Sequence, residues 1–277
     1  MKIAHLILTH ANPLQLKRLI QRLAHPDADF YIHIDLKTDI TNFLSLNSEN
    51  IKFIENRVAV YWGAYSIVQA TVNSFEEILK APQKYDYINL LSGQDYPLKS
   101  TAEIHDFFKN NLGKAFMHTL SVENEWQEAI PRLTKYHLCN YHFAGKHFVE
   151  KWMNKLLPSR KMPNNLIPVG RSQWFTITTE QAQYIVTYLQ ENKHVKRFFE
   201  LTWGSDEIVF QTILFNSKFQ QEMVNDNLRY IDWSEGKASP KTFTITDLSI
   251  LLNSGKLFAR KFNESVDTAI LDELEKT

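Results

Sequence analysis

The chain has 277 residues, and its 31 basic and 31 acidic side chains give a formal net charge of zero. This balance argues against general nucleic-acid binding, which needs a basic domain or stripe. Hydrophobic residues make up 44% of the chain and exclude a disordered composition, while the one cysteine, Cys139, excludes both an internal disulfide framework and a cysteine-rich zinc site.

Short apolar runs and helical patterns alternate along the first 120 residues. Residues 3–8 form an apolar run typical of a buried strand, and Asn12 and Pro13 then favour the capped first turn of a helix. Similar patterns predict further strands at residues 30–35, 51–54, 87–91 and 115–117, and further helices at residues 66–79 and 101–110. This alternation predicts an α/β fold with a mainly parallel sheet flanked by helices, whose ligands bind beyond the carboxyl ends of the strands.

The regular pattern stops at about residue 123 and returns at residue 173. His137, His142 and His147 lie five residues apart in this stretch, which favours ordinary core or surface histidines over metal ligands. Beyond it the sequence predicts a strand at 173–178, a helix at 180–190, another from about Asp206, and helical patterning from Thr246 onwards. We expect one domain over residues 1–277, with a nucleotide-binding half (1–120), an irregular insertion (121–171) and an acceptor and catalytic half (172–277).

One stretch of the insertion, residues 148–157, has an amphipathic pattern. In a helix its apolar residues would share one face, and two lysines, Lys151 and Lys155, would lie beside that face. The apolar residues are Phe148, Val149, Trp152 and Leu156. A helix of this kind suits an anionic membrane surface or a lipid-linked acceptor. Amphipathic helices also commonly pack against a protein core, and this is the interpretation that we prefer from the sequence.

Several common motifs are absent from the sequence. It contains no glycine-rich dinucleotide fingerprint, no phosphate-binding P-loop and no Gly-x-Ser-x-Gly elbow. The apolar run at the start is too short for a signal peptide, and no window approaches 18 apolar residues. These patterns predict a soluble, cytoplasmic protein that is at most peripheral to the inner face of a membrane.

Polar side chains follow three predicted strands, at the point where each strand ends. They are Thr9 and His10, then His33, Asp35 and Lys37, and then residues 92–95 (Ser-Gly-Gln-Asp). Because the carboxyl ends of parallel strands meet beside a ligand crevice, we expect these residues to lie together, although each alone is also a common turn former. The one Asp-x-Asp sequence, at Asp27 and Asp29, precedes a strand and is interpreted as a turn.

A further pattern is carried by residues 32–37 (Ile-His-Ile-Asp-Leu-Lys), 60–66 (Val-Tyr-Trp-Gly-Ala-Tyr-Ser), 89–98 (Asn-Leu-Leu-Ser-Gly-Gln-Asp-Tyr-Pro-Leu), 170–175 (Gly-Arg-Ser-Gln-Trp-Phe), 205–207 (Ser-Asp-Glu) and 258–262 (Phe-Ala-Arg-Lys-Phe). In this order the segments resemble glycosyltransferase family 14. That family includes the core-2 and I-branching β-1,6-N-acetylglucosaminyltransferases and the peptide O-xylosyltransferases. The resemblance runs from residue 3 to about 265. The chain is shorter than the animal enzymes and lacks their stem, anchor and cysteines, so it looks like a bacterial member.

The resemblance implies a GT-A-type fold without the usual Asp-x-Asp metal site, and inversion of the anomeric centre of a UDP-sugar. It assigns the catalytic base to Glu207. Chemistry makes the same demand, because an acceptor hydroxyl must lose its proton as it attacks. The acidic pair Asp206 and Glu207 also suits the start of the helix that follows, and the two roles are compatible.

Two basic residues near the carboxyl end of the family stabilise the leaving diphosphate, so neither a divalent metal nor another cofactor is expected. Lys261 matches one of these positions. Lys241 matches the other, with Lys237 as a nearby alternative. Lysine and arginine residues in such a region otherwise form a solvated face, an interpretation that suits Lys256 and Arg260.

Five residues at strand ends are expected to bind the UDP-sugar donor. Asp35 is the expected contact of the uridine portion, with Thr9, His10 and Lys37 beside it. Asp95 either holds the donor sugar or stabilises the loop before the following proline. These two interpretations of Asp95 are equally open.

The resemblance places Trp62, Gly63 and Ser66 in a nucleotide-proximal block. A buried structural tryptophan is nearly as good an explanation of Trp62. Trp174 and Trp233 are candidates for the acceptor side, because aromatic rings pack against the apolar faces of sugars. Core packing is the competing explanation for both.

Together these features predict an inverting, metal-independent glycosyltransferase. The expected donor is UDP-GlcNAc or UDP-xylose, and the expected acceptor is a hydroxyl of a glycan or a lipid-linked saccharide. The alternatives are a catalytically silent carbohydrate- or nucleotide-binding protein on the same scaffold and a nucleotide-sugar hydrolase. No nucleic-acid partner is expected.

Overall fold

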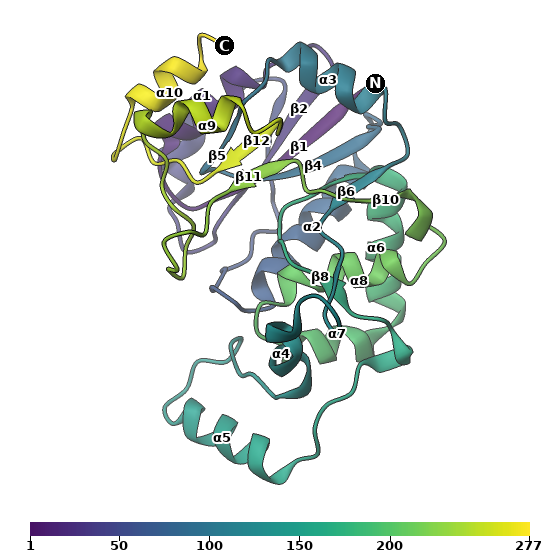
Figure 1. Cartoon of the computed structure of the whole chain (residues 1–277). Coiled ribbons are helices and arrows are strands. Elements are labelled where there is room, and N and C mark those ends of the chain that lie inside the picture. The colour runs from purple at the N-terminus through teal and green to yellow at the C-terminus, as the bar shows by residue number, and fades with distance from the viewer. The chain divides into compact units, whose positions relative to one another are not determined.

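The computed structural model describes residues 1–277, which form two compact units (Figure 1). Unit 1 comprises Met1–Glu55, Gln83–Gly113 and Leu228–Thr277, and unit 2 comprises Asn56–Pro82 and Lys114–Asn227. Both units contain residues that precede the insertion at 121–171 and residues that follow it. The unit boundaries therefore do not coincide with residues 120 and 172, where the sequence suggested a division into halves.

Four parallel strands form the main sheet of unit 1, in the order β3-β2-β1-β4. They are β1 (Ile3–Thr9), β2 (Ala28–Ile34), β3 (Ile51–Phe53) and β4 (Tyr87–Ser92). The β1 side chains are almost all buried, because parallel strands are covered on both faces. Helices of the same unit are α1 (Pro13–Arg22), the 3-10 helix η1 (Ile40–Leu46) and α3 (Thr101–Lys109). The predicted α/β class with a mainly parallel sheet is confirmed.

A second, smaller sheet of unit 1 joins segments far apart in the sequence. Strand β12 (Phe258–Arg260) pairs in parallel with β11 (Arg229–Ile231) and antiparallel with β5 (Asp95–Pro97). The carboxyl-terminal part also contains η6 (Ile245–Asp247), α9 (Leu248–Leu252) and α10 (Ala269–Leu274). The helical pattern predicted from Thr246 onwards is therefore only partly right, since it is interrupted by β12, whose pairing with β5 is not local.

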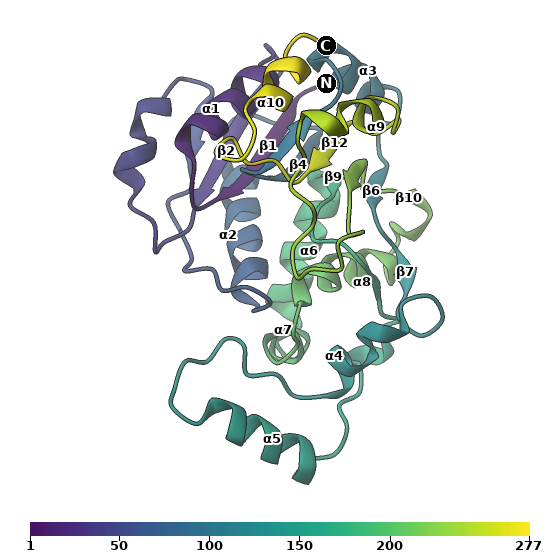
Figure 2. The same cartoon turned by 60° about the vertical axis from the view of Figure 1, so that its left-hand side comes forward.

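Unit 2 packs helices against a mixed sheet (Figure 2). Strand β6 (Ala115–Met117) pairs in parallel with β10 (Met223–Asn225) and antiparallel with β9 (Thr176–Thr178). The main helices are α2 (Ser66–Lys80), α6 (Thr179–Glu191), α7 (Lys193–Glu200) and α8 (Val209–Phe215). The buried rings of Phe75, Phe175 and Phe210 lie 5.3–6.3 Å apart and hold α2, α8 and the segment before β9 together.

Short elements complete unit 2. They are β7 (Leu120–Ser121) paired with β8 (Val169–Gly170), η2 (Gln127–Ala129), α4 (Ile130–Thr134), α5 (Lys146–Leu156), η3 (Pro163–Asn165), η4 (Ser205–Glu207) and η5 (Gln220–Glu222). The segment without regular patterning thus contains a helix of eleven residues, α5. None of its residues is buried. The preferred interpretation, in which the amphipathic stretch packs against the core, is wrong.

The start of α1 differs in detail from the prediction. Pro13 occupies the first turn as expected, because its fixed φ suits a helix start. Asn12 stands at the cap position, but it adopts a left-handed conformation (φ 57°) and its side chain makes no capping hydrogen bond. Its amide instead donates to Asn263 Oδ1 (3.4 Å) and links α1 to the carboxyl-terminal segment.

No helix of the structure is both long enough and apolar enough to cross a membrane.

Candidate functional site

Four of the predicted donor residues lie together at the carboxyl ends of β1 and β2. The amide of Asp35 donates to Thr9 O (2.9 Å), and the Thr38 hydroxyl donates to His10 O (3.1 Å). The Asp35 carboxylate accepts hydrogen bonds from Lys37 N (2.9 Å) and pairs with Lys37 Nζ (3.1 Å). Parallel pairing of β1 with β2 produces this arrangement, because it aligns Thr9 with Ile34.

A cleft of about 510 Å³ opens beside these strand ends. The loop after β1 and the start of α1 form one wall, and Thr38 and η1 form the other. The lining residues are His10, Ala11, Asn12, Pro13, Leu14, Thr38, Asn42, Phe43 and Ser45. The cleft has the position that an open parallel sheet gives to its ligands.

Asp95 is fully buried, and both of its carboxylate oxygens are engaged within unit 1. One oxygen accepts from Ser92 N (2.9 Å), and the other pairs with Arg260 Nη1 (2.8 Å). These contacts agree with the interpretation in which Asp95 stabilises the loop. Arg260 is mostly buried in this ion pair, so the prediction that it lies on a solvated face is wrong.

The three lysines considered for the diphosphate differ in their surroundings. Lys237 is exposed and pairs with Glu235 (2.9 Å), whereas Lys241 is half-buried and pairs with Asp247 (2.6 Å). The ammonium group of Lys261 forms no ion pair and no side-chain hydrogen bond. Burial and the neighbouring Arg260 charge lower the pKa of Lys261. An uncompensated, partly buried cation beside a second cation is an environment that favours an anion.

The backbones near Lys241 and Lys261 lie next to each other. Phe243 N donates to Lys261 O (2.9 Å), which ties the chain after Lys241 to the end of β12. Gln15 on α1 donates to both Gly93 O (3.2 Å) and Phe262 O (3.1 Å). The segments at 89–98 and 258–262, which carry two of the sequence patterns, are therefore joined in unit 1.

Three other segments of the sequence pattern meet in unit 2, around Glu207. Gly204 N donates to Gly63 O (2.8 Å), and Arg171 N donates to Glu207 O (2.9 Å). A Cβ atom on Gly170 would lie 2.1 Å from Glu207 O, so only glycine permits this approach. The backbone of Glu207 is thus held by segments that are far apart in the sequence.

Arg132 holds the side chain of Glu207. Its Nη1 lies 2.6 Å from Glu207 Oε2, and its guanidinium lies over the rings of Trp203 (4.2 Å) and Trp126 (4.8 Å). The Glu207 side chain keeps 30% of its surface exposed. Burial raises the pKa of Glu207, and the Arg132 charge opposes this shift. A carboxylate that is oriented, accessible and more basic than usual can accept a proton.

Sequence reasoning missed Arg132 entirely. The residue lies in α4, within the stretch that lacks regular patterning, and 75 positions separate it from Glu207. Its two aromatic neighbours, Trp126 and Trp203, are also distant from one another along the chain. No spacing rule connects them, so only the folded unit brings these residues together.

The neighbouring acid, Asp206, has the opposite environment. Its side chain is buried, and its Oδ1 atom has no hydrogen-bond partner. Burial, and to a smaller extent the Glu207 charge, raise the pKa of Asp206. Of the two acids, only Glu207 has an accessible carboxylate. Both acids lie in the 3-10 turn η4, and α8 begins two residues after Glu207, so neither lies in the first turn of α8.

The remaining predicted residues are spread over both units. Trp62 is 70% exposed and meets Trp203 edge to face, so the alternative of a buried structural tryptophan is wrong. Gly63 has φ 69° and packs against the Trp203 ring, and the Ser66 hydroxyl accepts from Tyr61 N (2.9 Å). Trp174 is buried in unit 2, as core packing requires, whereas Trp233 in unit 1 is exposed.

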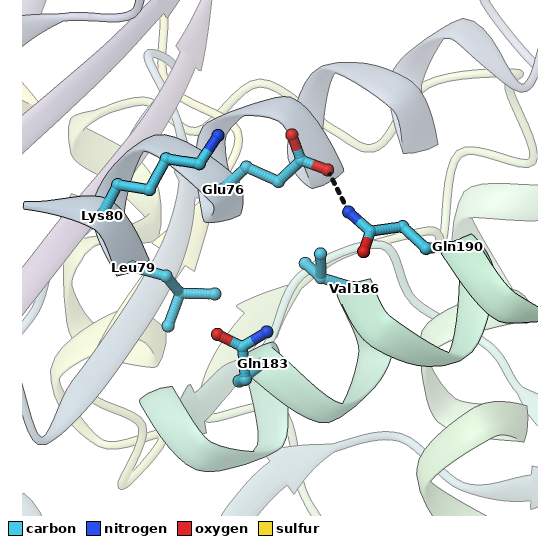
Figure 3. Close-up of a pocket in the computed structure, with 6 residues that line it drawn as sticks. All are labelled: Glu76, Leu79, Lys80, Gln183, Val186 and Gln190. Carbon is cyan, nitrogen blue, oxygen red and sulfur yellow. Dashed lines mark hydrogen bonds between the residues drawn. The ribbon is translucent and has the colours of Figure 1, made fainter.

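Another cavity, of about 240 Å³, lies in unit 2 between α2 and α6 (Figure 3). It is lined by Glu76, Leu79, Lys80, Gln183, Val186 and Gln190. Gln190 Nε2 donates to Glu76 Oε1 (2.8 Å) across its rim. None of the candidate residues lines it, and its one acid, Glu76, is already hydrogen-bonded to Gln190. We therefore do not place the chemistry there.

The sequence profile of the Core-2/I-Branching enzyme family matches residues 3–252. The chain belongs to this family. Among curated relatives, xylosyltransferase 2 of Homo sapiens is 26% identical over 301 residues, covering 99% of this chain and 33% of the relative. The xylosyltransferase of Ciona intestinalis is 24% identical over 295 residues, covering 99% and 34%. The chain thus spans about one third of the length of these relatives.

Among solved structures, mouse xyloside xylosyltransferase 1 in its apo form is similar with a TM-score of 0.41 at 13% identity, covering 93% of this chain and 97% of that one. The sequence relatives align with nearly the whole chain. Their alignment therefore includes the Lys261 region, which lies beyond the residues matched by the family profile.

Proposed function

We propose that this member of the Core-2/I-Branching family is a glycosyltransferase that moves a sugar, GlcNAc or xylose, from a UDP-sugar to a saccharide hydroxyl. The observation that carries the proposal is the accessible Glu207 carboxylate, held by Arg132 and by three segments of the family pattern. The names of its xylosyltransferase relatives support the same class of reaction.

The proposed reaction is a single displacement with inversion. Glu207 accepts the proton of the acceptor hydroxyl as the hydroxyl oxygen attacks the anomeric carbon of the donor. The bond from that carbon to the diphosphate breaks through an oxocarbenium-like transition state, as in glycoside hydrolysis, and UDP leaves with the electron pair. Arg132 keeps the Glu207 carboxylate ionised and oriented before the proton moves.

We assign the charge of the leaving diphosphate to lysine side chains and not to a divalent metal. Lys261 is the stronger candidate because no carboxylate neutralises it, while Lys241 is already paired with Asp247. The Asp-x-Asp sequence does not compete for this role. Asp29 lies in β2, whose opposite end carries Asp35, and its carboxylate accepts a hydrogen bond from the Tyr85 hydroxyl (2.6 Å).

A donor panel tests the proposal. UDP and its cognate UDP-sugar should raise the melting temperature, because ligands that bind only the folded state stabilise it. A saccharide acceptor should accelerate release of UDP and appear in a glycosylated product. UDP binding without turnover would identify a silent binding protein. UDP release that no acceptor accelerates would identify a nucleotide-sugar hydrolase.

Replacement of Asp35 by alanine should weaken the binding of UDP by roughly 1.5–3 kcal/mol, the range for hydrogen bonds that involve a charged group. If Asp35 contacts the uridine portion, uridine and UDP should lose similar binding free energy. Titration calorimetry on the wild type, on Asp35→Ala and on the exposed control Asp106→Ala measures both ligands. Unchanged affinity for UDP in a folded Asp35→Ala variant would mean that Asp35 has only a structural role, in the turn that it forms with Lys37.

Replacement of Arg132 by glutamine should move the acid limb of the pH profile of turnover upwards by about one unit, the lower end of the shift expected for a carboxylate beside an arginine. The sign follows from the loss of the cation, which leaves the ionised Glu207 less stable, so that the base protonates at higher pH. Arg132→Lys should restore part of the wild-type profile, and the exposed Arg197→Gln variant should match the wild type. If the acid limb of the pH profile of Arg132→Gln coincides with that of the wild type, Arg132 only supports the fold.

A further inference from the structure

Helix α5 turns its apolar face towards solvent. Phe148 is 66% exposed, Trp152 41% and Leu156 71%, and Val149 beside them is also exposed. Figures 1 and 2 both draw α5 apart from α6, α7 and α8, the helices that cover the core of unit 2. An exposed apolar strip of this kind marks an interaction site.

Hydrogen bonds on the other side of α5 determine this orientation. Leu138 N donates to the Glu150 carboxylate (2.8 Å). Asn154 accepts from Tyr136 N (2.8 Å) and donates to Tyr136 O (2.8 Å). At 3.6 residues per turn, positions 150 and 154 lie opposite the row formed by 148, 152 and 156. The polar edge of α5 is thus attached to the preceding loop, and its apolar row faces outwards.

The surroundings of the apolar row are basic. Residues 135–161 contain one acid, Glu150, and its carboxylate is engaged on the attached side of α5. The exposed or half-buried basic residues of this stretch are Lys135, Lys146, Lys151, Lys155 and Lys161, whereas Arg160 is buried and donates to Leu201 O. Lys155 Nζ lies 4.9 Å from the centre of the Trp152 ring, which packs edge to face on Phe148 (6.0 Å). Large aromatic and aliphatic side chains beside lysines are typical of helices that lie in a membrane interface.

We propose that α5 is a membrane-docking helix, which inserts Phe148, Trp152 and Leu156 among the headgroups of an anionic bilayer. The local excess of positive charge selects a negatively charged surface, and each lysine near the surface adds attraction to anionic lipids. A second copy of the chain is a poorer partner, because a symmetric pair of α5 helices would bring Lys151 and Lys155 of both copies together.

Sedimentation with vesicles tests the proposal without donor or acceptor, so its outcome is independent of the proposed function. The protein should sediment at low salt with vesicles of equal parts phosphatidylcholine and phosphatidylglycerol, and much less with vesicles of phosphatidylcholine alone. Added salt should release it, because screening weakens attraction between exposed charges. Vesicles that contain no saccharide exclude capture of a lipid-linked acceptor.

Two sets of variants assign the binding to α5. Phe148→Ser/Trp152→Ser/Leu156→Ser and, separately, Lys151→Glu/Lys155→Glu should each lower vesicle affinity at least about tenfold. The matched controls change exposed residues elsewhere, Leu112→Ser/Ile250→Ser/Val266→Ser and Lys17→Glu/Lys84→Glu, and should bind as the wild type does. Circular dichroism and melting temperatures establish that the variants fold.

Three outcomes would overturn the proposal. The first is a wild-type protein that does not sediment with the anionic vesicles at low salt. The second is an equal loss of binding in the α5 variants and in their controls. The third is a dimer in light scattering that the apolar-row variant dissociates while no vesicle binding occurs, which would make a second copy the occupant of this face.

Discussion

The Glu207→Gln variant is expected to bind UDP as the wild type does and to lose turnover by about 10²–10⁴-fold, the usual contribution of a general base. The amide keeps the size of the side chain and an oxygen that can accept from Arg132 Nη1, but it cannot take the proton of an attacking hydroxyl. The loss should therefore appear in the chemical step. Initial rates with saturating donor and acceptor, together with calorimetry of UDP binding, measure the two effects separately.

Glu191→Gln is the matched control, because Glu191 is an exposed acid of α6 in the same unit. It should leave both turnover and UDP affinity unchanged. Glu207→Gln should also melt within a few degrees of the wild type, because the Glu207 carboxylate is partly exposed and its backbone contacts with Gly170 and Arg171 do not depend on the side chain. Turnover close to the wild-type value would remove the base role from Glu207.

The second large effect is expected at Lys261. Lys261→Ala should lower turnover more than it weakens the binding of uridine, because negative charge on the leaving phosphate grows towards the transition state while the uridine contacts stay constant. Lys241→Ala should have a smaller effect, since the Lys241 ammonium is already neutralised by Asp247. The exposed pair Lys237 and Glu235 supplies the control, and Lys237→Ala should resemble the wild type.

The same assay, run with and without EDTA, tests metal independence. Lysine side chains remain in place when solution cations are removed, so turnover should survive the chelator. Activity that disappears in EDTA and returns fully with manganese would contradict the lysine mechanism. Carboxylates of unit 1, such as Asp35 and Asp39, would then become the candidate ligands.

The strands and helices of the parallel part of unit 1 were predictable because their signals are local. The apolar run at residues 3–8 and the helical spacing at residues 101–110 each lie within a single element, and the structure has β1 and α3 at these places. The short strands β5 and β12 carry no such signal. They form because residues 95–97 and 258–260 pair with one another, and this pairing depends on the rest of the fold.

The residues of the candidate site also fall into those that local sequence patterns predicted and those that only the fold brings together. Alternation of strands and helices placed Thr9 and Asp35 at neighbouring strand ends, and the register of β1 with β2 joins them through a backbone hydrogen bond. The family pattern pointed to Glu207 but not to its partner. Arg132 became visible only in the folded unit, because an ion pair across 75 positions leaves no periodic trace in the chain.

The sequence by itself determined which residues of this protein share a face or an element, because helical and strand periodicities are properties of neighbouring residues. It grouped Phe148, Trp152 and Leu156 on one side of a helix, and Asp206 with Glu207 at one turn. Only the tertiary structure decided which way these groups point. Hydrogen bonds that join Glu150 and Asn154 to the preceding loop turn the apolar row of α5 outwards. Arg132 and the segment at Gly170 hold Glu207 with its carboxylate accessible while Asp206 is buried, and these contacts form between segments that are distant along the chain.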